Sequence, residues 1–206
     1  RTKLCRQVIV KVKNRLLQAM EEKIFNHFQK MIEATMINGE TYTDVIASAA
    51  EKIATALLAG NTIFTLGAKS GVQMAQLFSD YLTLGYFIDR PGFPSINLNQ
   101  ITQNSSDNER FNQALNIHGK GGDVLILISA GNNDPLLINA LNSAVDRGMT
   151  ILLMSAVNDD LLSAPVSYND IHISNADLSV PLTTQSQLQV IQCICELIDG
   201  HIFGGE

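Results

Sequence analysis

Residues 119–134 read Gly-Lys-Gly-Gly-Asp-Val-Leu-Ile-Leu-Ile-Ser-Ala-Gly-Asn-Asn-Asp, and this stretch decides the fold. After a glycine-rich turn, residues 123–129 form a nearly unbroken apolar run, which is typical of a strand buried on both faces of a parallel sheet. A polar loop follows and ends at Asp134, and Pro135 suits the first turn of a helix. A buried strand that leads through a polar loop into a helix is the unit from which parallel α/β sheets are built.

On either side of this stretch, strand-like and helical patterns alternate. Strands are predicted at residues 62–66, 94–98, 149–155 and 170–174, and helices at residues 72–84, 111–117, 135–147 and 184–198. Two further helices, at residues 20–37 and 43–57, precede the first strand, with a break at Asn38-Gly39, Thr43 as an N-cap and Gly200 as the stop of the last helix. The alternation predicts a mostly parallel sheet that is covered by helices on both faces.

The net charge of −6 is unevenly distributed along the 206 residues. Residues 1–19 contain six basic and no acidic residues, whereas residues 20–206 contain eight basic and 20 acidic residues, a net charge of −12. Because Met20 opens a fresh helical pattern, we interpret residues 1–19 as a leader from an expression vector or a misplaced start, with a basic amphipathic arm as the alternative. Residues 20–206 are expected to form a single domain that does not bind nucleic acid, since such binding needs clustered Lys and Arg.

Cysteine usage and hydropathy point to a cytoplasmic protein. Cys5, Cys193 and Cys195 form no disulfide framework, and Cys193 and Cys195 should lie on different faces of one helix. No Cys/His cluster has metal-site spacing, so neither a metal nor another cofactor is expected. No apolar run approaches the roughly 20 residues that span a bilayer, and no membrane association is expected.

The carboxyl ends of the strands are the expected place for a ligand. Parallel sheets bind ligands there, at the point where the strand order reverses. The loops at residues 67–71 and 129–134 both lead into helix N-termini, where free N–H groups favour anions. The sequence therefore predicts two phosphate-binding loops that face one cleft.

Several short motifs together resemble the sugar isomerase (SIS) domain family. They are Gly60-Asn61-Thr62-Ile63, Arg90-Pro91-Gly92-Phe93-Pro94, Gly121-Gly122-Asp123-Val124-Leu125 and Arg147-Gly148-Met149-Thr150. The resemblance covers about residues 20–203 and includes the phosphoheptose isomerases and their paralogue, the DnaA initiator-associating protein DiaA, which residues 193–199 resemble most. It implies a bacterial homotetramer with a flavodoxin-like, three-layer α-β-α fold around a five-stranded parallel sheet.

The resemblance also implies which residues contact a phosphosugar. Where the isomerases have Gly-Asn-Gly-Gly-Ser and Ser-Thr-Ser-Gly-Asn-Ser, residues 67–71 read Gly-Ala-Lys-Ser-Gly and residues 129–134 read Ser-Ala-Gly-Asn-Asn-Asp. The remaining candidates for sugar-phosphate binding are Lys69, Ser70, Ser129, Asn132 and Asn133. Lys69 either replaces the lost donors or faces solvent, and Asp134 either repels a phosphate or caps the following helix.

The residues that would transfer protons differ from those of the isomerases. Their His and Glu on the helix after the first loop correspond to Leu77 and Tyr81, and their Glu and His on the last helix correspond to Gln185 and Gln187. Leucine and amides transfer no protons, and a neutral tyrosine is a poor base near pH 7. We expect Leu77 to be a core residue, and we expect no catalysis from these four positions.

Three functions stay open at this point. The preferred one is a non-catalytic tetrameric scaffold that binds DnaA and regulates the initiation of DNA replication. In that case Ile202 and Phe203 either contact the partner or pack on their own subunit. The alternatives are an active sedoheptulose 7-phosphate isomerase and a sensor that binds a phosphosugar without converting it.

Overall fold

Five parallel strands form the centre of the molecule. A computed structural model describes residues 2–86, 88–104, 107, 109–175 and 178–204, with side chains from residue 15 onward. The strands are β1 (Ile63–Gly67), β2 (Ser95–Asn97), β3 (Val124–Ile128), β4 (Thr150–Ser155) and β5 (Ile171–Ser174). Their order is β2-β1-β3-β4-β5, and every neighbouring pair is parallel. The predicted flavodoxin-like sheet is confirmed, and each strand lies within a residue or two of its predicted range.

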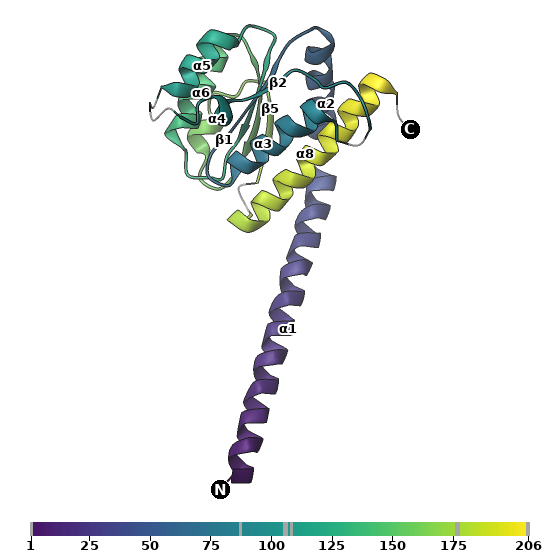
Figure 1. Cartoon of the computed structure of the whole chain (residues 1–206), viewed down its shortest axis with the longest axis vertical. Helices are drawn as coiled ribbons and strands as arrows, with labels where there is room; N and C mark the ends of the chain where they lie inside the picture. Colours follow the sequence, from purple (N-terminus) through teal and green to yellow (C-terminus); the bar gives the residue numbers. More distant parts are fainter. Residues whose placement is uncertain (1, 87, 105–106, 108, 176–177, 205–206) are drawn as a thin grey trace.

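Alternate residues of the strands point to opposite faces of the sheet, and each face is covered by helices (Figure 1). In β3, Val124, Ile126 and Ile128 pack toward α2 (Thr43–Leu58), α3 (Gly71–Leu84) and α8 (Val180–Phe203). Leu125 and Leu127 pack toward the other layer, whose members are α4 (Leu98–Ile101), α5 (Arg110–His118), α6 (Pro135–Asp146) and α7 (Asp160–Ser163). The expected three-layer α-β-α architecture is therefore present.

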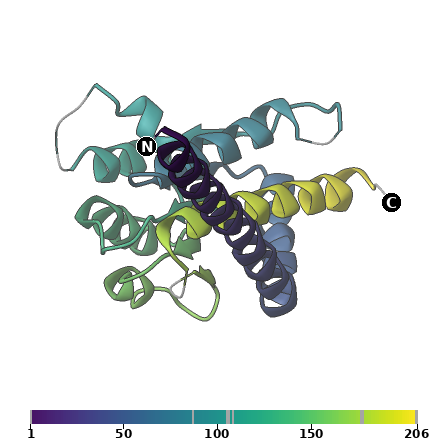
Figure 2. The same ribbon diagram turned by 90° about the horizontal axis from the view of Figure 1, so that it is seen from below.

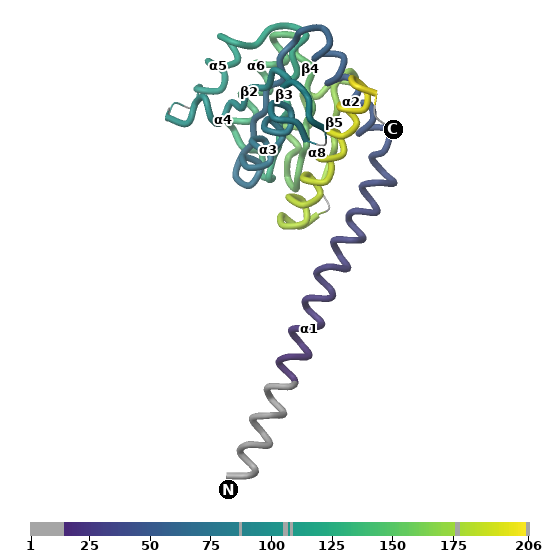
Figure 3. Tube along the Cα trace, turned by 45° about the vertical axis from the view of Figure 1, so that its right-hand side comes forward, coloured from purple at the N-terminus to yellow at the C-terminus, as the bar shows by residue number. Residues whose placement is uncertain are grey.

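The first helix, α1 (Thr2–Thr41), extends far beyond the three layers (Figure 1), and in the view from below it crosses in front of α8 (Figure 2). The predicted break at Asn38-Gly39 is wrong, because α1 runs through both residues. Asn38 is buried and its Nδ2 donates to Ser186 Oγ of α8 at 2.5 Å, so a tertiary contact outweighs the low helix propensity of Gly39. Figure 3 shows that only the end of α1 near α2 and α8 meets the domain.

Two further helix boundaries differ from the prediction. Thr43 is the first residue of α2 and not its cap, and its hydroxyl donates to the Gly39 carbonyl at the end of α1. The last helix begins at Val180, not Thr184, and continues through Gly200 to Phe203. It ends there because Gly204 adopts a left-handed conformation with φ of 69°. The short helices α4 and α7 were not predicted, since four residues show no periodicity.

Nothing in the fold separates a leader from the domain or tests its origin. The backbone of α1 is one helix across Met20, and the side chains of residues 1–14 lie outside the described part of the chain. The interpretation of residues 1–19 as a vector-derived leader stays a prediction. Within the described residues, no helix combines the length and the apolar character that crossing a membrane requires.

Candidate functional site

The two predicted phosphate loops lie side by side at the carboxyl edge of the sheet. β1 and β3 are neighbours, while β2 lies on the other side of β1, so the strand order reverses between β1 and β3. A Cβ atom on Gly67 would lie 2.0 Å from the Gly71 carbonyl oxygen, and one on Gly71 would lie 2.2 Å from that of Ile128. Only glycine fits at these two positions, and this close approach sets the start of α3 directly against the end of β3.

Lys69, Ser70 and one further hydroxyl gather at the start of α3. Lys69 is exposed with φ of 53°, and its Nζ donates to the Gly131 carbonyl of the second loop at 3.3 Å. Ser70 Oγ accepts a hydrogen bond from Thr184 Oγ1 of α8 at 3.3 Å. Among the described residues no side chain caps the N-terminus of α3. Its first two N–H groups, those of Gly71 and Val72, donate to the carbonyls of Ala68 and Lys69 at 2.8 and 3.3 Å. The site therefore combines a cation, two hydroxyls and a helix N-terminus without a side-chain cap, and the cation, the hydroxyls and the helix dipole all favour an anion.

Thr184 is a residue of the site that the sequence does not predict. It lies in the first turns of α8, about 114 positions after Ser70, and only the packing of α8 over the loops brings the two hydroxyls together. No local pattern in the sequence signals that contact.

The other three predicted sugar-phosphate residues are engaged within the protein. Ser129 is fully buried, and its Oγ accepts from the Gly131 N–H at 3.0 Å, which shapes the second loop. Asn132 and Asn133 adopt φ of 71° and 47°. Their side-chain oxygens accept from Asn158 Nδ2 at 3.3 Å and from the Leu161 N–H at 2.9 Å. The structure thus brings Lys69 and Ser70 together but directs both asparagines toward the loop after β4.

Asp134 caps the second helix of the site. Its Oδ1 accepts from the Leu136 N–H at 3.0 Å, and Pro135 occupies the first turn of α6. The capping interpretation of Asp134 is confirmed. The N-terminus of α6 therefore already has a carboxylate, whereas that of α3 has none.

Gln187 and Gln185 occupy different surroundings although both lie on α8. Gln187 is 1% exposed, and its Nε2 donates to the Ser129 carbonyl at the end of β3 at 2.8 Å. Gln185 instead lines a small cavity of about 10 Å³ between α1 and α8, together with Met31 and Thr35. Side chains two positions apart on a helix point in directions that differ by about 200°. Only Gln187 therefore reaches the loops.

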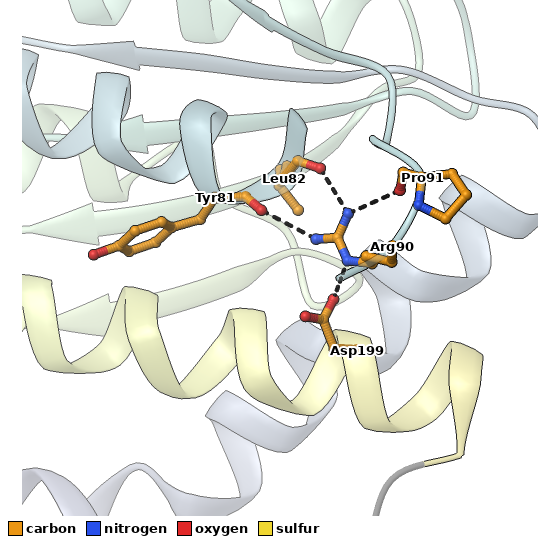
Figure 4. Close-up of polar contacts among 5 residues, drawn as sticks. All are labelled: Tyr81, Leu82, Arg90, Pro91 and Asp199. Atoms are coloured by element: carbon orange, nitrogen blue, oxygen red, sulfur yellow. Dashed lines mark hydrogen bonds and ion pairs between the residues drawn. The ribbon is translucent and has the colours of Figure 1, made fainter. Parts of the chain in front are cut away.

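The two α3 positions hold no proton-transferring group in the site. Leu77 is partly exposed and belongs to neither buried core cluster, so the prediction that it is a core residue is wrong. Tyr81 packs against Tyr86 with ring centroids 4.5 Å apart. Figure 4 shows its phenol pointing away from Arg90, to which only its backbone carbonyl is bonded. Burial, together with Tyr81 and Glu196, raises the pKa of the Tyr86 phenol, which stays protonated near neutral pH.

Ile202 and Phe203 at the end of α8 both pack on their own chain. Ile202 packs against the core, and Phe203 stacks on Phe93 of its own chain with ring centroids 6.0 Å apart. Phe203 is still 47% exposed. The pair is thus largely held by its own subunit, with one aromatic face left open.

Within the described residues, no group of His, Cys, Asp and Glu side chains is arranged to hold a metal ion. Cys193 is exposed and Cys195 is buried, as their spacing on one helix predicted. Burial raises the pKa of both thiols above the ordinary cysteine value.

Comparison with known proteins shows the family of the chain. A family described as the SIS domain matches residues 26–155. The chain belongs to the SIS domain family. The phosphoheptose isomerase of Shewanella pealeana is 30% identical over 191 residues, which cover 89% of this SIS protein and 97% of the relative.

Solved structures of other SIS proteins share the fold. A phosphoheptose isomerase from Francisella tularensis superimposes with a TM-score of 0.78 at 21% identity, covering 87% of this chain and 98% of the other. The phosphoheptose isomerase of Neisseria gonorrhoeae gives a TM-score of 0.77 at 20% identity, with coverages of 88% and 99%. These likenesses confirm the fold of a phosphoheptose isomerase-like SIS protein.

Proposed function

We propose that this SIS protein binds phosphosugars at the carboxyl edge of its sheet and does not isomerise them. The observation that carries the proposal is the uncapped N-terminus of α3, around which Lys69, Ser70 and Thr184 gather. A phosphate dianion suits such a site because hydroxyls and an ammonium group donate hydrogen bonds to it and the helix dipole favours negative charge. The phosphoheptose isomerase relatives support a phosphosugar as the ligand class.

The absence of turnover is inferred from the side chains at the family's proton-transfer positions. An aldose–ketose interconversion needs an acid and a base within hydrogen-bond reach of the substrate carbonyl. Gln187 is an amide bonded to a backbone carbonyl, and Gln185 faces α1. Leu77 has no group that transfers a proton, and the Tyr81 ring packs against Tyr86 with centroids 4.5 Å apart. An active sedoheptulose 7-phosphate isomerase is the competing function.

A titration and a turnover assay on one preparation test the proposal. Calorimetry should detect binding of sedoheptulose 7-phosphate and weaker binding of inorganic phosphate, while sedoheptulose itself gives no heat. Lys69→Met should lower both affinities, whereas Lys120→Met, an exposed lysine at the opposite edge of the sheet, should leave them unchanged. Product formation at ordinary enzyme concentration would establish the isomerase instead, and no heat with any phosphorylated ligand would overturn the binding function.

We also propose that the chain self-associates through α1. Large apolar side chains recur every fourth residue along α1, and each of them is 57–60% exposed: Leu16, Met20, Ile24, Phe28, Ile32 and Met36. Because each step of four residues advances about 40° around a helix, these side chains form a stripe that winds around α1. An exposed apolar stripe on a helix that stands clear of its domain is unfavourable in water unless another surface covers it (Figure 1). The expected homotetramer would bury it against further copies of α1.

Sedimentation equilibrium tests the self-association. Phe28→Glu should lower the mass toward that of one chain, because the charge falls in the middle of the stripe. Gln29→Glu introduces the same charge one position away and should preserve the assembly. A wild-type protein that sediments as a monomer at micromolar concentration would rule the assembly out.

The scaffold function with DnaA as partner remains a separate prediction. The half-exposed ring of Phe203 is the feature that favours it, since exposed aromatic residues often anchor interfaces. Retention of DnaA by the wild type and its loss in Phe203→Ala would support the scaffold. Equal retention by both proteins would remove Phe203 from the contact, and no retention by the wild type would remove the function.

A further inference from the structure

Gln187 has a polar atom without a partner among the residues that the structure describes. The side chain is 1% exposed, and its Nε2 is fixed by the hydrogen bond to the Ser129 carbonyl. Its Oε1 is buried and accepts no hydrogen bond from the described part of the chain. A buried acceptor of this kind costs about 1–3 kcal/mol of desolvation if it stays unsatisfied. Buried polar groups without a hydrogen-bond partner are rare in proteins, so a partner outside the described chain is expected for this atom.

The place of Gln187 on α8 connects this free acceptor with the two phosphate loops. Thr184 and Gln187 are three residues apart and therefore share one face of α8. Thr184 touches Ser70 of the first loop, and Gln187 touches Ser129 at the start of the second. One face of the helix thus closes over the point where both loops diverge.

The amide is also fixed in orientation. Because Nε2 must donate to the Ser129 carbonyl, the two ends of the amide cannot exchange without losing that bond. Oε1 is thereby held as an acceptor only. It suits a hydroxyl group, which donates, and it does not suit a phosphate, which accepts.

We propose that Gln187 determines ligand specificity by accepting a hydrogen bond from a hydroxyl of the bound sugar. The inference rests on the proposed phosphosugar-binding function and adds the group that distinguishes a phosphorylated polyol from phosphate alone. In this arrangement the phosphate is bound by Lys69, Ser70, Thr184 and the α3 N-terminus. Gln187 binds a hydroxyl group of the carbon chain.

Gln187→Met tests this role, and Gln185→Met is the matched control. Both changes remove a side-chain amide of similar size from the same helix, and both residues have a buried, unpartnered Oε1. Only Gln187 contacts the loops. We expect Gln187→Met to weaken sedoheptulose 7-phosphate binding by roughly 10- to 100-fold while the affinity for inorganic phosphate is unchanged. Gln185→Met should change neither affinity.

The difference between the changes in affinity for the two ligands distinguishes a role in specificity from a purely structural role. A loss of both affinities in Gln187→Met, or of neither, would overturn the proposal and leave Gln187 as a structural residue satisfied by water. Wild-type protein that binds no phosphorylated ligand would overturn the proposed function together with it. If the variant does not fold, the side-chain amide resonances of wild-type Gln187 decide: they should shift with the phosphosugar but not with phosphate, and unmoved resonances would refute the role.

Discussion

Arg90 Nε donates to Asp199 Oδ1 at 2.6 Å, and the two side chains are only 1% and 3% exposed (Figure 4). The same guanidinium donates to the carbonyls of Tyr81 and Leu82 in the last turn of α3, at 3.0 and 2.9 Å. One buried cation therefore joins the end of α3 to α8. Since α3 also starts at the first phosphate loop, this joint fixes how α8 lies over the site.

Breaking the Arg90–Asp199 pair should destabilise the fold strongly. Asp199→Ala leaves an uncompensated buried guanidinium, and we expect a loss of about 3–5 kcal/mol in the free energy of unfolding, measured by urea denaturation. Glu196→Gln, three residues away on the exposed side of α8, should change it by less than about 0.5 kcal/mol. The double variant Arg90→Met, Asp199→Ala should lose less than the sum of the single variants, and strict additivity would contradict the pairing.

The fold was largely predictable because the apolar pattern of a buried strand lies within a few consecutive residues. Residues 123–129 are apolar on both faces and lie in the middle of the sheet. The helix ends were less predictable, since the contact of Asn38 with Ser186 carries α1 through a glycine, and the two residues are 148 positions apart. The same difference between local and long-range signals applies to the site residues. Its loops are local motifs, whereas Thr184 reaches Ser70 only through the packing of α8.

Protonation of His172 should destabilise the folded chain. His172 Nε2 lies 2.7 Å from Ser155 Oγ on the neighbouring strand. Burial lowers the pKa of this imidazole, an effect that the nearby Asp159 opposes in part. Because an unfolded histidine has a pKa of about 6.5, the unfolded chain takes up the proton first as the pH falls. The stabilising contribution is therefore complete above about pH 6.5 and is lost as the pH falls toward the folded-state pKa.

The measurement for His172 is a series of urea transitions between neutral pH and pH 5. The wild type should lose stability more steeply over this range than His172→Gln, which keeps a hydrogen-bonding group near Ser155 but does not titrate. Parallel curves for the two proteins would show that His172 is not responsible.

Two glycine substitutions should have opposite effects. Gly67→Ala places a Cβ 2.0 Å from the Gly71 carbonyl oxygen, so the start of α3 must move away from the end of β1. We expect reduced stability and lost phosphosugar binding. Gly39→Ala meets nothing within 4 Å inside α1, and it should stabilise the protein by about 0.5–1 kcal/mol with binding unchanged. Thermal unfolding and calorimetry measure both effects, and full binding by Gly67→Ala would contradict the close-approach argument.

Asp134→Asn should strengthen phosphate binding without weakening the fold. The Asp134 carboxylate lies at the start of α6, on the same edge of the sheet as the α3 N-terminus, and therefore repels an approaching dianion. Asparagine caps helices about as well as aspartate, so the hydrogen bond to the Leu136 N–H can persist while the charge disappears. We expect a severalfold gain in affinity for sedoheptulose 7-phosphate at low salt and a smaller gain at high salt, because salt screens the repulsion. Asp146→Asn, at the far end of the same helix, should leave the affinity nearly unchanged. An affinity that falls in Asp134→Asn while Asp146→Asn is unaffected would mean that the carboxylate takes part in binding and does not oppose it.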